Sequence, residues 1–178
     1  MNLSVSAPHS SGLLIAGRAV TSLDKDLLKA AKYGDHDGVV DDLIQGANPL
    51  TWNEDFRTAL ALVSKFGRSY YAQTEHQDDA QIANALLEAG AKVNALDSRW
   101  RTPLMEASLS LKPNTVEILL AHQADVFARD KYSHTAYSDA AWILQANPNR
   151  DEEGKSVLSL LSGSMKKTQS YVTTPDTE

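Results

Sequence analysis

The sequence predicts an all-α fold: a solenoid of helix-turn-helix repeats with hairpin or loop tips along one edge. Three segments align on a threonine that lies five residues after an Asn or Asp and twelve residues after the end of a helix-like block. Those blocks also match one another, since each reads as an amphipathic helix that ends in a Gly-Ala or Gln-Ala turn. Internal repetition of this kind is typical of repeat architectures, in which stacked units share one core.

The aligned threonines are Thr58, Thr102 and Thr135. Thr102 precedes Pro103, a sequence that suits the start of a helix, with threonine as the cap and proline in the first turn. Gly46 and Gly90 stand where the end of a helix favours a left-handed residue. We therefore expect a first helix after each threonine and a second helix before each turn.

The segments "ALLEAGAKVNALD" and "RTPLMEA" resemble the ankyrin repeat, whose scheme is D-x-x-G-x-T-P-L-H-x-A-A-x-x-G, a second helix and LLxxGAdvN. The resemblance implies an ankyrin-type domain over residues 23–163, with repeats at about 24–52, 53–96, 97–129 and 130–163. The second repeat is about eleven residues too long, with the extra residues at 68–80. That insertion is either a partner-contacting loop, a lengthened helix pair or a disordered segment.

The last repeat is irregular and leaves two alternatives. Residues 156–163 are either its second helix, after an enlarged loop at 145–155, or part of a truncated fifth repeat; we favour the first. Residues 1–22 and 164–178 are rich in Ser and Thr, and we expect both to be disordered tails.

Composition excludes several classes of protein. The chain has 178 residues, enough for one domain, and no cysteine, so thiolate zinc sites and cysteine nucleophiles are excluded. A formal net charge of −6 argues against dedicated binding of nucleic acid or anionic membranes. No apolar run approaches the roughly 20 residues that span a bilayer, and the N-terminus is a poor secretory signal, so we expect a cytoplasmic protein.

Catalytic and metal-binding motifs are not found in the sequence. The five histidines form neither an i, i+4 pair nor H-E-x-x-H, and there is no G-x-S-x-G, Walker loop or Rossmann fingerprint. Glu106 and Asp139 could approach across adjacent repeats, which alone is weak support for catalysis. We expect no enzyme activity, no cofactor and no metal.

The resemblance implies that a partner meets the tips and the exposed residues of the first helices. Tyr70 and Tyr71 of the insertion are added as candidates. The predicted partner-binding residues are Lys32, Tyr33, Trp52, Phe56, Arg57, Lys65, Phe66, Tyr70, Tyr71, Arg99, Trp100, Arg101, Leu109, Lys131, Tyr132, His134 and Trp142.

Aromatic and basic residues dominate the tips and first helices. These positions hold seven of the twelve aromatics and all three tryptophans, which is the composition of interface hot spots. Six Lys and Arg side chains oppose only Glu54 and Asp55 there. The sequence thus indicates a basic, aromatic face that would attract a partner with an acidic patch.

Phe56 and Trp100 occupy tip positions where the family has glycine. A bulky residue should avoid the positive φ that glycine adopts, so we expect these tips to differ in shape from the family's. The two side chains either contact a partner or pack on each other or on the insertion.

The predicted function is that of a non-enzymatic protein-binding module, monomeric on its own, that inhibits, sequesters or protects against one partner protein. An adaptor, a scaffold or a secreted effector that recruits a partner is the alternative within this class. A binder of nucleic acid or another anionic ligand is the alternative from a different class, and its binding would depend steeply on salt.

Overall fold

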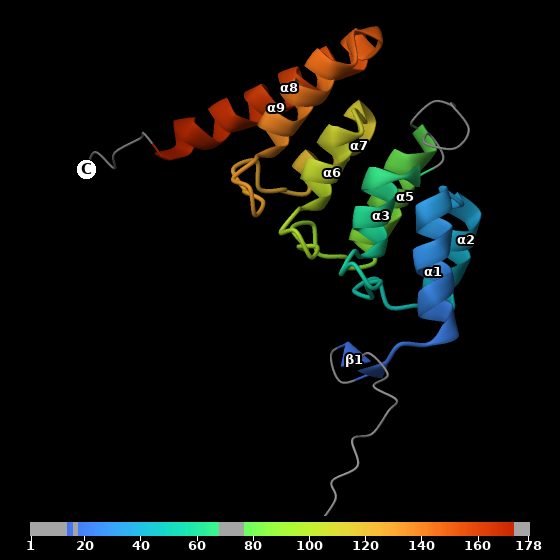
Figure 1. The fold of residues 1–178 in the computed structure, drawn as a ribbon. Helices are drawn as coiled ribbons and strands as arrows, with labels where there is room; N and C mark the ends of the chain where they lie inside the picture. Colours follow the sequence, from blue (N-terminus) through green and yellow to red (C-terminus); the bar gives the residue numbers. More distant parts are fainter. Residues whose placement is uncertain (1–13, 16–17, 68–76, 173–178) are drawn as a thin grey trace, which may run out of the picture.

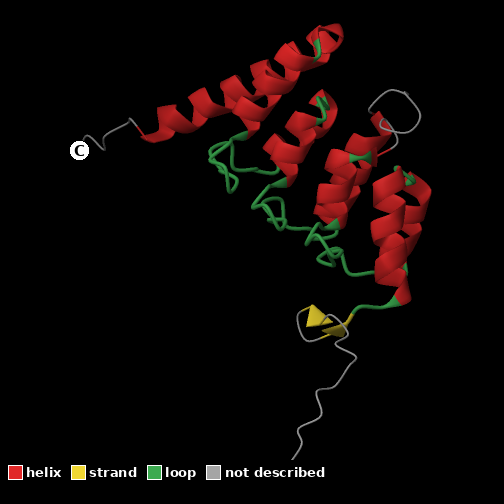
Figure 2. Ribbon diagram, in the orientation of Figure 1, coloured by secondary structure: helices red, strands yellow, loops and turns green. Residues whose placement is uncertain are grey.

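The computed structural model describes residues 14–15, 18–67 and 77–172, and the helices form a stack of pairs (Figure 1). The pairs are α1(Ser22–Tyr33) with α2(His36–Ile44), α3(Ala59–Lys65) with α5(Gln77–Glu88), α6(Pro103–Leu109) with α7(Pro113–Ala121), and α8(Ala136–Ala146) with α9(Asp151–Val172). The first helices α1, α3, α6 and α8 contact one another in succession, as do the second helices α2, α5, α7 and α9. The predicted all-α repeat solenoid is confirmed, with loops along one edge (Figure 2).

The aligned threonines begin their helices as predicted. Thr58, Thr102 and Thr135 each cap a first helix, with the side-chain oxygen accepting the backbone N–H three residues later at 3.2–3.3 Å. Such a cap satisfies a donor that has no partner within the helix and contributes about 1 kcal/mol. The repeated threonine therefore fixes where each unit starts.

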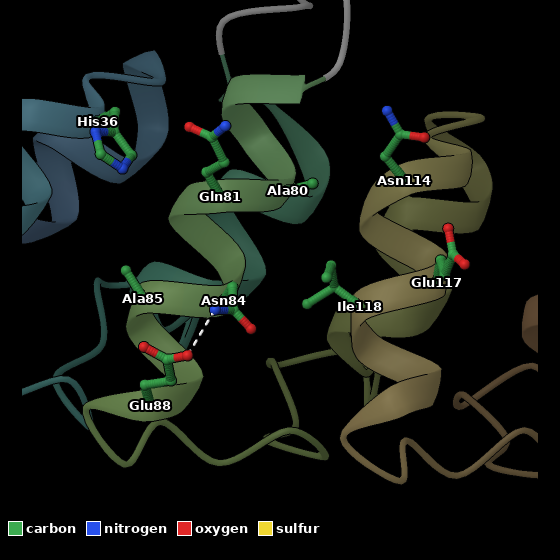
Figure 3. A pocket seen from close by; sticks show the side chains of 9 residues that line it. All are labelled: His36, Ala80, Gln81, Asn84, Ala85, Glu88, Asn114, Glu117 and Ile118. Atoms are coloured by element: carbon green, nitrogen blue, oxygen red, sulfur yellow. Dashed lines mark hydrogen bonds between the residues drawn. The ribbon is translucent and has the colours of Figure 1, made fainter.

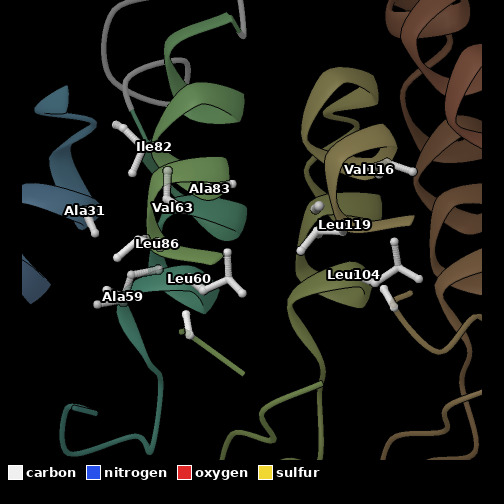
Figure 4. Packing of buried hydrophobic residues seen from close by; sticks show 14 of the residues in the cluster. Ala31, Ala59, Leu60, Val63, Ile82, Ala83, Leu86, Leu104, Val116 and Leu119 are labelled. Carbon is white, nitrogen blue, oxygen red and sulfur yellow. The ribbon is translucent and has the colours of Figure 1, made fainter. Parts of the chain in front are cut away.

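One apolar core runs through the whole stack, from Leu27 in α1 to Leu161 in α9. Leu60 and Leu86 of the second pair and Leu104 and Leu119 of the third are completely buried (Figure 4). Burial of each such side chain stabilises the fold by roughly 1.5–3 kcal/mol. No pair could bury these side chains alone, so each depends on its neighbours.

The turns that end the second helices α2, α5 and α7 are left-handed. Gly46 and Gly90 have φ of 93° and 94°, as the sequence predicted, and Gln123 takes the equivalent place with φ of 63°. Glycine adopts this conformation without the steric cost that a side chain brings. The third unit therefore keeps the left-handed turn of the first two units without their glycine.

Both ends of the domain differ from expectation. β1(Leu14–Ile15) and β2(Arg18–Ala19) pair antiparallel, so the prediction of a disordered N-terminal tail is wrong for these two segments. The predicted C-terminal tail is wrong for residues 164–172, because α9 continues to Val172. Met165 still packs against the core, which gives this extension a reason to stay helical.

The last repeat follows the first of its two alternatives. α9 packs on both α8 and α7, the place of the second helix of a fourth unit. The predicted enlarged loop at 145–155 is wrong, since α8 reaches Ala146, a 3₁₀ turn covers Pro148–Arg150 and α9 starts at Asp151. A short turn suffices because α9 begins earlier than its apolar residues indicate.

A buried lysine ties the second and third units together. Lys112, in the turn between α6 and α7, is 1% exposed. Its ammonium donates to the carbonyl oxygens of Val63 and Phe66 at 2.8 and 2.7 Å and pairs with Asp79 Oδ2 at 2.9 Å. Burial lowers the pKa of Lys112, while the nearby Asp79 carboxylate acts to raise it. No pattern in the sequence singles out this residue.

Candidate partner-binding surface

Three hairpin tips, residues 53–57, 97–101 and 130–134, are built in the same way. The side chains of Asn53, Asp97 and Asp130 each accept two backbone N–H groups, two and four residues later, at 2.8–3.0 Å. In each tip the first and last residues also join through a backbone hydrogen bond of 3.0–3.1 Å. Asn and Asp suit this place because their short side chains can satisfy the backbone of a tight turn.

Backbone hydrogen bonds also connect neighbouring tips. The N–H of Ser98 donates to the carbonyl of Asp55 at 3.0 Å, and the N–H of Lys131 donates to the carbonyl of Arg99 at 3.1 Å. The tips therefore form one row along the edge of the stack (Figure 2).

The expectation that Phe56 and Trp100 avoid positive φ is wrong. Their φ values are 60° and 63°, and Ser133, in the same place of the third tip, has φ of 66°. The side-chain and backbone hydrogen bonds of the tip hold this conformation, although it costs a residue with a side chain about 1–2 kcal/mol. Strain of this kind in an exposed loop often accompanies a functional role.

The strained positions present their aromatic rings to solvent. Phe56 is 54% exposed and Trp100 is 56% exposed. Phe56 stacks on Trp52 at 6.3 Å between ring centroids, and the ammonium of Lys131 lies 5.7 Å from the Trp100 ring. The ring contacts within the described residues thus pair Phe56 with Trp52 and Trp100 with Lys131, and Phe56 and Trp100 each keep more than half of their surface accessible.

The other predicted aromatics lie on the third tip or on first helices. Tyr132 on the third tip is 68% exposed and Trp142 on α8 is 64% exposed. Tyr33 is also exposed, whereas Phe66 is half-buried. Lys32 and Lys65 sit over the Phe66 ring at 5.7 and 5.4 Å, so these cations cover an aromatic face instead of standing free.

Arg57 is not available to a partner, which corrects the sequence-based prediction. Its side chain is buried beneath the first tip, where it pairs with Asp55 at 2.7 Å, Asp97 at 3.5 Å and Glu106 at 3.6 Å. Arg101 repeats the arrangement one unit later, with Nε 3.6 Å from Asp130 Oδ2. Both arginines therefore hold adjacent tips together.

These ion pairs reduce the positive charge that the sequence placed on this face. Lys65 pairs with Glu106 at 3.7 Å, and burial lowers its pKa while Glu106 acts to raise it. Arg99 and Lys131 are the predicted basic residues that are exposed on the tips. Tyr70 and Tyr71 lie outside the described residues.

The remaining predicted residues, Leu109 and His134, line a cavity of about 420 Å³ beside α8. Leu109 is half-buried and His134 is exposed. The same cavity is lined by Arg101, Trp142 and Asp139, a carboxyl whose pKa burial raises to about 6. The sequence alone places Asp139 only as one of two carboxylates on neighbouring repeats.

Described residues also line hollows away from this cavity. An apolar one of about 420 Å³ is lined by Trp52, Phe56 and Leu96 under the first tip. A polar groove of about 560 Å³ runs over α5 and α7 on the side of the second helices (Figure 3). Its Asn84 donates to Glu88 at 2.8 Å, so polar groups of this groove satisfy each other.

The part of the chain that the structure describes contains no group of three or more acidic or histidine side chains placed to hold a metal ion. In the same residues, no helix combines the length and the apolar character that crossing a membrane requires.

The fold and the row of tips define a class, the helical repeat solenoids that present tips along one edge. The sequence model of the family described as ankyrin repeats (3 copies) matches residues 27–130, more than half of the chain, and the chain belongs to this family. The predicted resemblance is confirmed. Ankyrin repeats are general protein–protein interaction modules and are typically not enzymes.

Two curated relatives share the repeats. The chain is 38% identical over 71 residues to the Ankyrin repeat and LEM domain-containing protein 1 homolog of Caenorhabditis elegans, covering 40% of this chain and 10% of that protein. It is 37% identical over 81 residues to Rabankyrin-5 of Mus musculus, covering 44% of this chain and 7% of that protein. The chain thus spans a tenth or less of the length of either relative.

Proposed function

We propose that this protein binds a partner protein through the row of tips and the adjoining face of the first helices. The observation that carries the proposal is Trp100, which is held at a φ of 63° with 56% of its surface exposed. Tryptophan is among the residues that contribute most to protein interfaces, and its exposure has no role in packing the repeats. Arg99 and Lys131 beside it would meet acidic groups of the partner.

Such a surface acts by occupancy. We propose that the bound chain covers a site that the partner needs, and so inhibits it, sequesters it or protects against it. Pairing of Arg57, Arg101 and Lys65 with carboxylates favours a protein over a nucleic acid as the partner, because it leaves few cations to meet a phosphate backbone.

The test is affinity capture from a lysate of the source organism with the wild-type chain and two variants. Trp100→Ala removes the exposed ring, and Ile44→Ala, on α2 and 79% exposed, is the matched control away from the tips. We expect one protein to be lost with Trp100→Ala and retained with Ile44→Ala, while circular dichroism shows both variants folded. Equal capture by all three chains would remove the tips as the binding site.

A further inference from the structure

Equivalent positions of successive units can be compared by counting from the aligned threonine. One residue before it stand Arg57 and Arg101, and seven residues after it stand Lys65 and Leu109. The cation at the first position is thus kept from the second unit to the third, while the cation at the second position is replaced by leucine.

In the second unit both cations meet one buried carboxylate of the following unit. Glu106, four residues after Thr102, has a side chain 2% exposed. Arg57 Nε lies 3.6 Å from its Oε1, and Lys65 Nζ lies 3.7 Å from its Oε2. Two cations thus offset the cost of burying one carboxylate.

Asp139 is the equivalent carboxylate of the next unit, four residues after Thr135, and its side chain is 6% exposed. Arg101 is engaged with Asp130, and Leu109 offers no charge. Among the described residues, the ion-pair contact of Asp139 is with His134 Nδ1 at 3.8 Å, which is charged only when the ring is protonated. Asp139 Oδ2 is buried and accepts no hydrogen bond from a described residue.

The cavity of about 420 Å³ opens at this carboxylate. Leu109 and Trp142 supply apolar and aromatic walls, and Trp142 is 64% exposed. The cavity therefore combines the buried carboxylate of Asp139, which no counterpart of Lys65 pairs with, and the Trp142 ring, which can attract a cation.

We propose that this cavity accepts a lysine or arginine side chain of the partner protein, with its cation at Asp139 and its methylene stem against Leu109 and Trp142. The bound side chain takes the place that Lys65 fills in the preceding unit. This inference rests on the proposed function, since the partner supplies the side chain.

The titration of Asp139 agrees with this assignment. Burial raises its pKa to about 6, an effect that Arg101 and His134 oppose and that Asp130 and Glu106 reinforce. The carboxyl is therefore ionised at neutral pH but poorly compensated, and an incoming cation gains from this. Protonation below pH 6 removes the attraction.

The test uses probes that need no partner. n-Butylammonium and n-butylguanidinium mimic the two basic side chains, n-butanol is the neutral match, and the indole N–H signals of the full chain are followed by NMR. We expect both cations to shift the Trp142 signal saturably, with a dissociation constant of about 10 mM as suits so small a ligand. The signals of Trp52 and Trp100, outside the cavity, stay in place.

Two variants make the result decisive. Asp139→Asn keeps the shape and removes the charge, and Leu109→Lys supplies the cation from within the chain; both should abolish the saturable shift and remain folded by circular dichroism. No saturable shift in the wild type, an equal shift with n-butanol, or a shift retained in Asp139→Asn would overturn the proposal. Trp100→Ala should leave the probe shift unchanged, so failure of the cavity and failure of the tips are told apart.

Discussion

Lys112 and Asp79 form a buried ion pair, with Nζ 2.9 Å from Oδ2 and both side chains 2% exposed or less. The lysine belongs to the turn of the third unit and the aspartate to α5 of the second, so the pair crosses the boundary between them. A charge buried this deeply is retained only when its partners are in place.

Replacing Lys112 by methionine should be strongly destabilising. The change leaves the Asp79 carboxylate without this cation and removes the donor to the carbonyls of Val63 and Phe66. We expect a loss of about 3–5 kcal/mol in the free energy of unfolding, measured by urea denaturation. Lys155→Met is the matched control, because Lys155 pairs with Asp151 on the exposed side of α9. Removal of this exposed ion pair should not change the free energy of unfolding measurably. Similar midpoints for the two variants would contradict a buried role for Lys112.

Stability should depend on pH through Asp139. Its folded pKa of about 6 exceeds the ordinary value of 3.8, so the folded chain binds this proton more tightly than the unfolded chain does. The contribution to stability is therefore present at low pH and is lost as the pH rises from 4 to 6. Asp139→Asn should match the wild type at pH 4 and exceed its stability by about 2 kcal/mol at pH 7. Urea midpoints that differ equally at both pH values would refute this assignment.

Trp100→Gly and Trp100→Ala should differ in stability although both remove the ring. Glycine relieves the positive φ, whereas alanine keeps it, so the glycine variant should be more stable than the alanine variant by about 1 kcal/mol. Thermal melts of the two proteins measure the difference, and both should lose the partner. An alanine variant as stable as the glycine variant would mean that the tip relaxes to a different conformation.

Gly90→Ala and Gly163→Ala test the left-handed turn without any steric contact. An added Cβ meets no atom within 4 Å at either place, but only Gly90 has positive φ, at +94°. We expect Gly90→Ala to lower the free energy of unfolding by about 1 kcal/mol. Gly163→Ala, inside α9, should raise it by roughly 0.5–1 kcal/mol. Stabilisation by both substitutions would contradict the repeat boundary at Gly90.

Much of the fold follows from local sequence. Thr58, Thr102 and Thr135 act through bonds to residues three places away, and Gly46 and Gly90 through their own backbone freedom, so short-range patterns predict them. The extent of α9 was not predictable in this way, because its last turns carry mostly polar residues around one packed Met165.

The site was predicted less completely. Aromatic residues at the tips are indeed exposed. Sequence spacing, however, cannot tell which tip side chain turns inward. Arg57 turns inward because carboxylates of the next unit lie beneath it. The sequence predicts a reshaped tip at Trp100, whereas the Asp97 side chain holds the same left-handed conformation that the other two tips have. The cavity beside Asp139 is lined by residues from two units, so it forms only when the units are stacked.

The hydrogen bonds from Ser98 to Asp55 and from Lys131 to Arg99 have a consequence for binding kinetics. Loops that fluctuate independently lose conformational entropy when a partner orders them, and that loss weakens the complex. Here each tip is already hydrogen-bonded to the next, so most of the conformational entropy of the tips is lost when the protein folds. Complex formation should therefore require little rearrangement of the tips. A mutation that breaks one of these hydrogen bonds should speed dissociation of the partner, even where the mutated residue does not contact the partner.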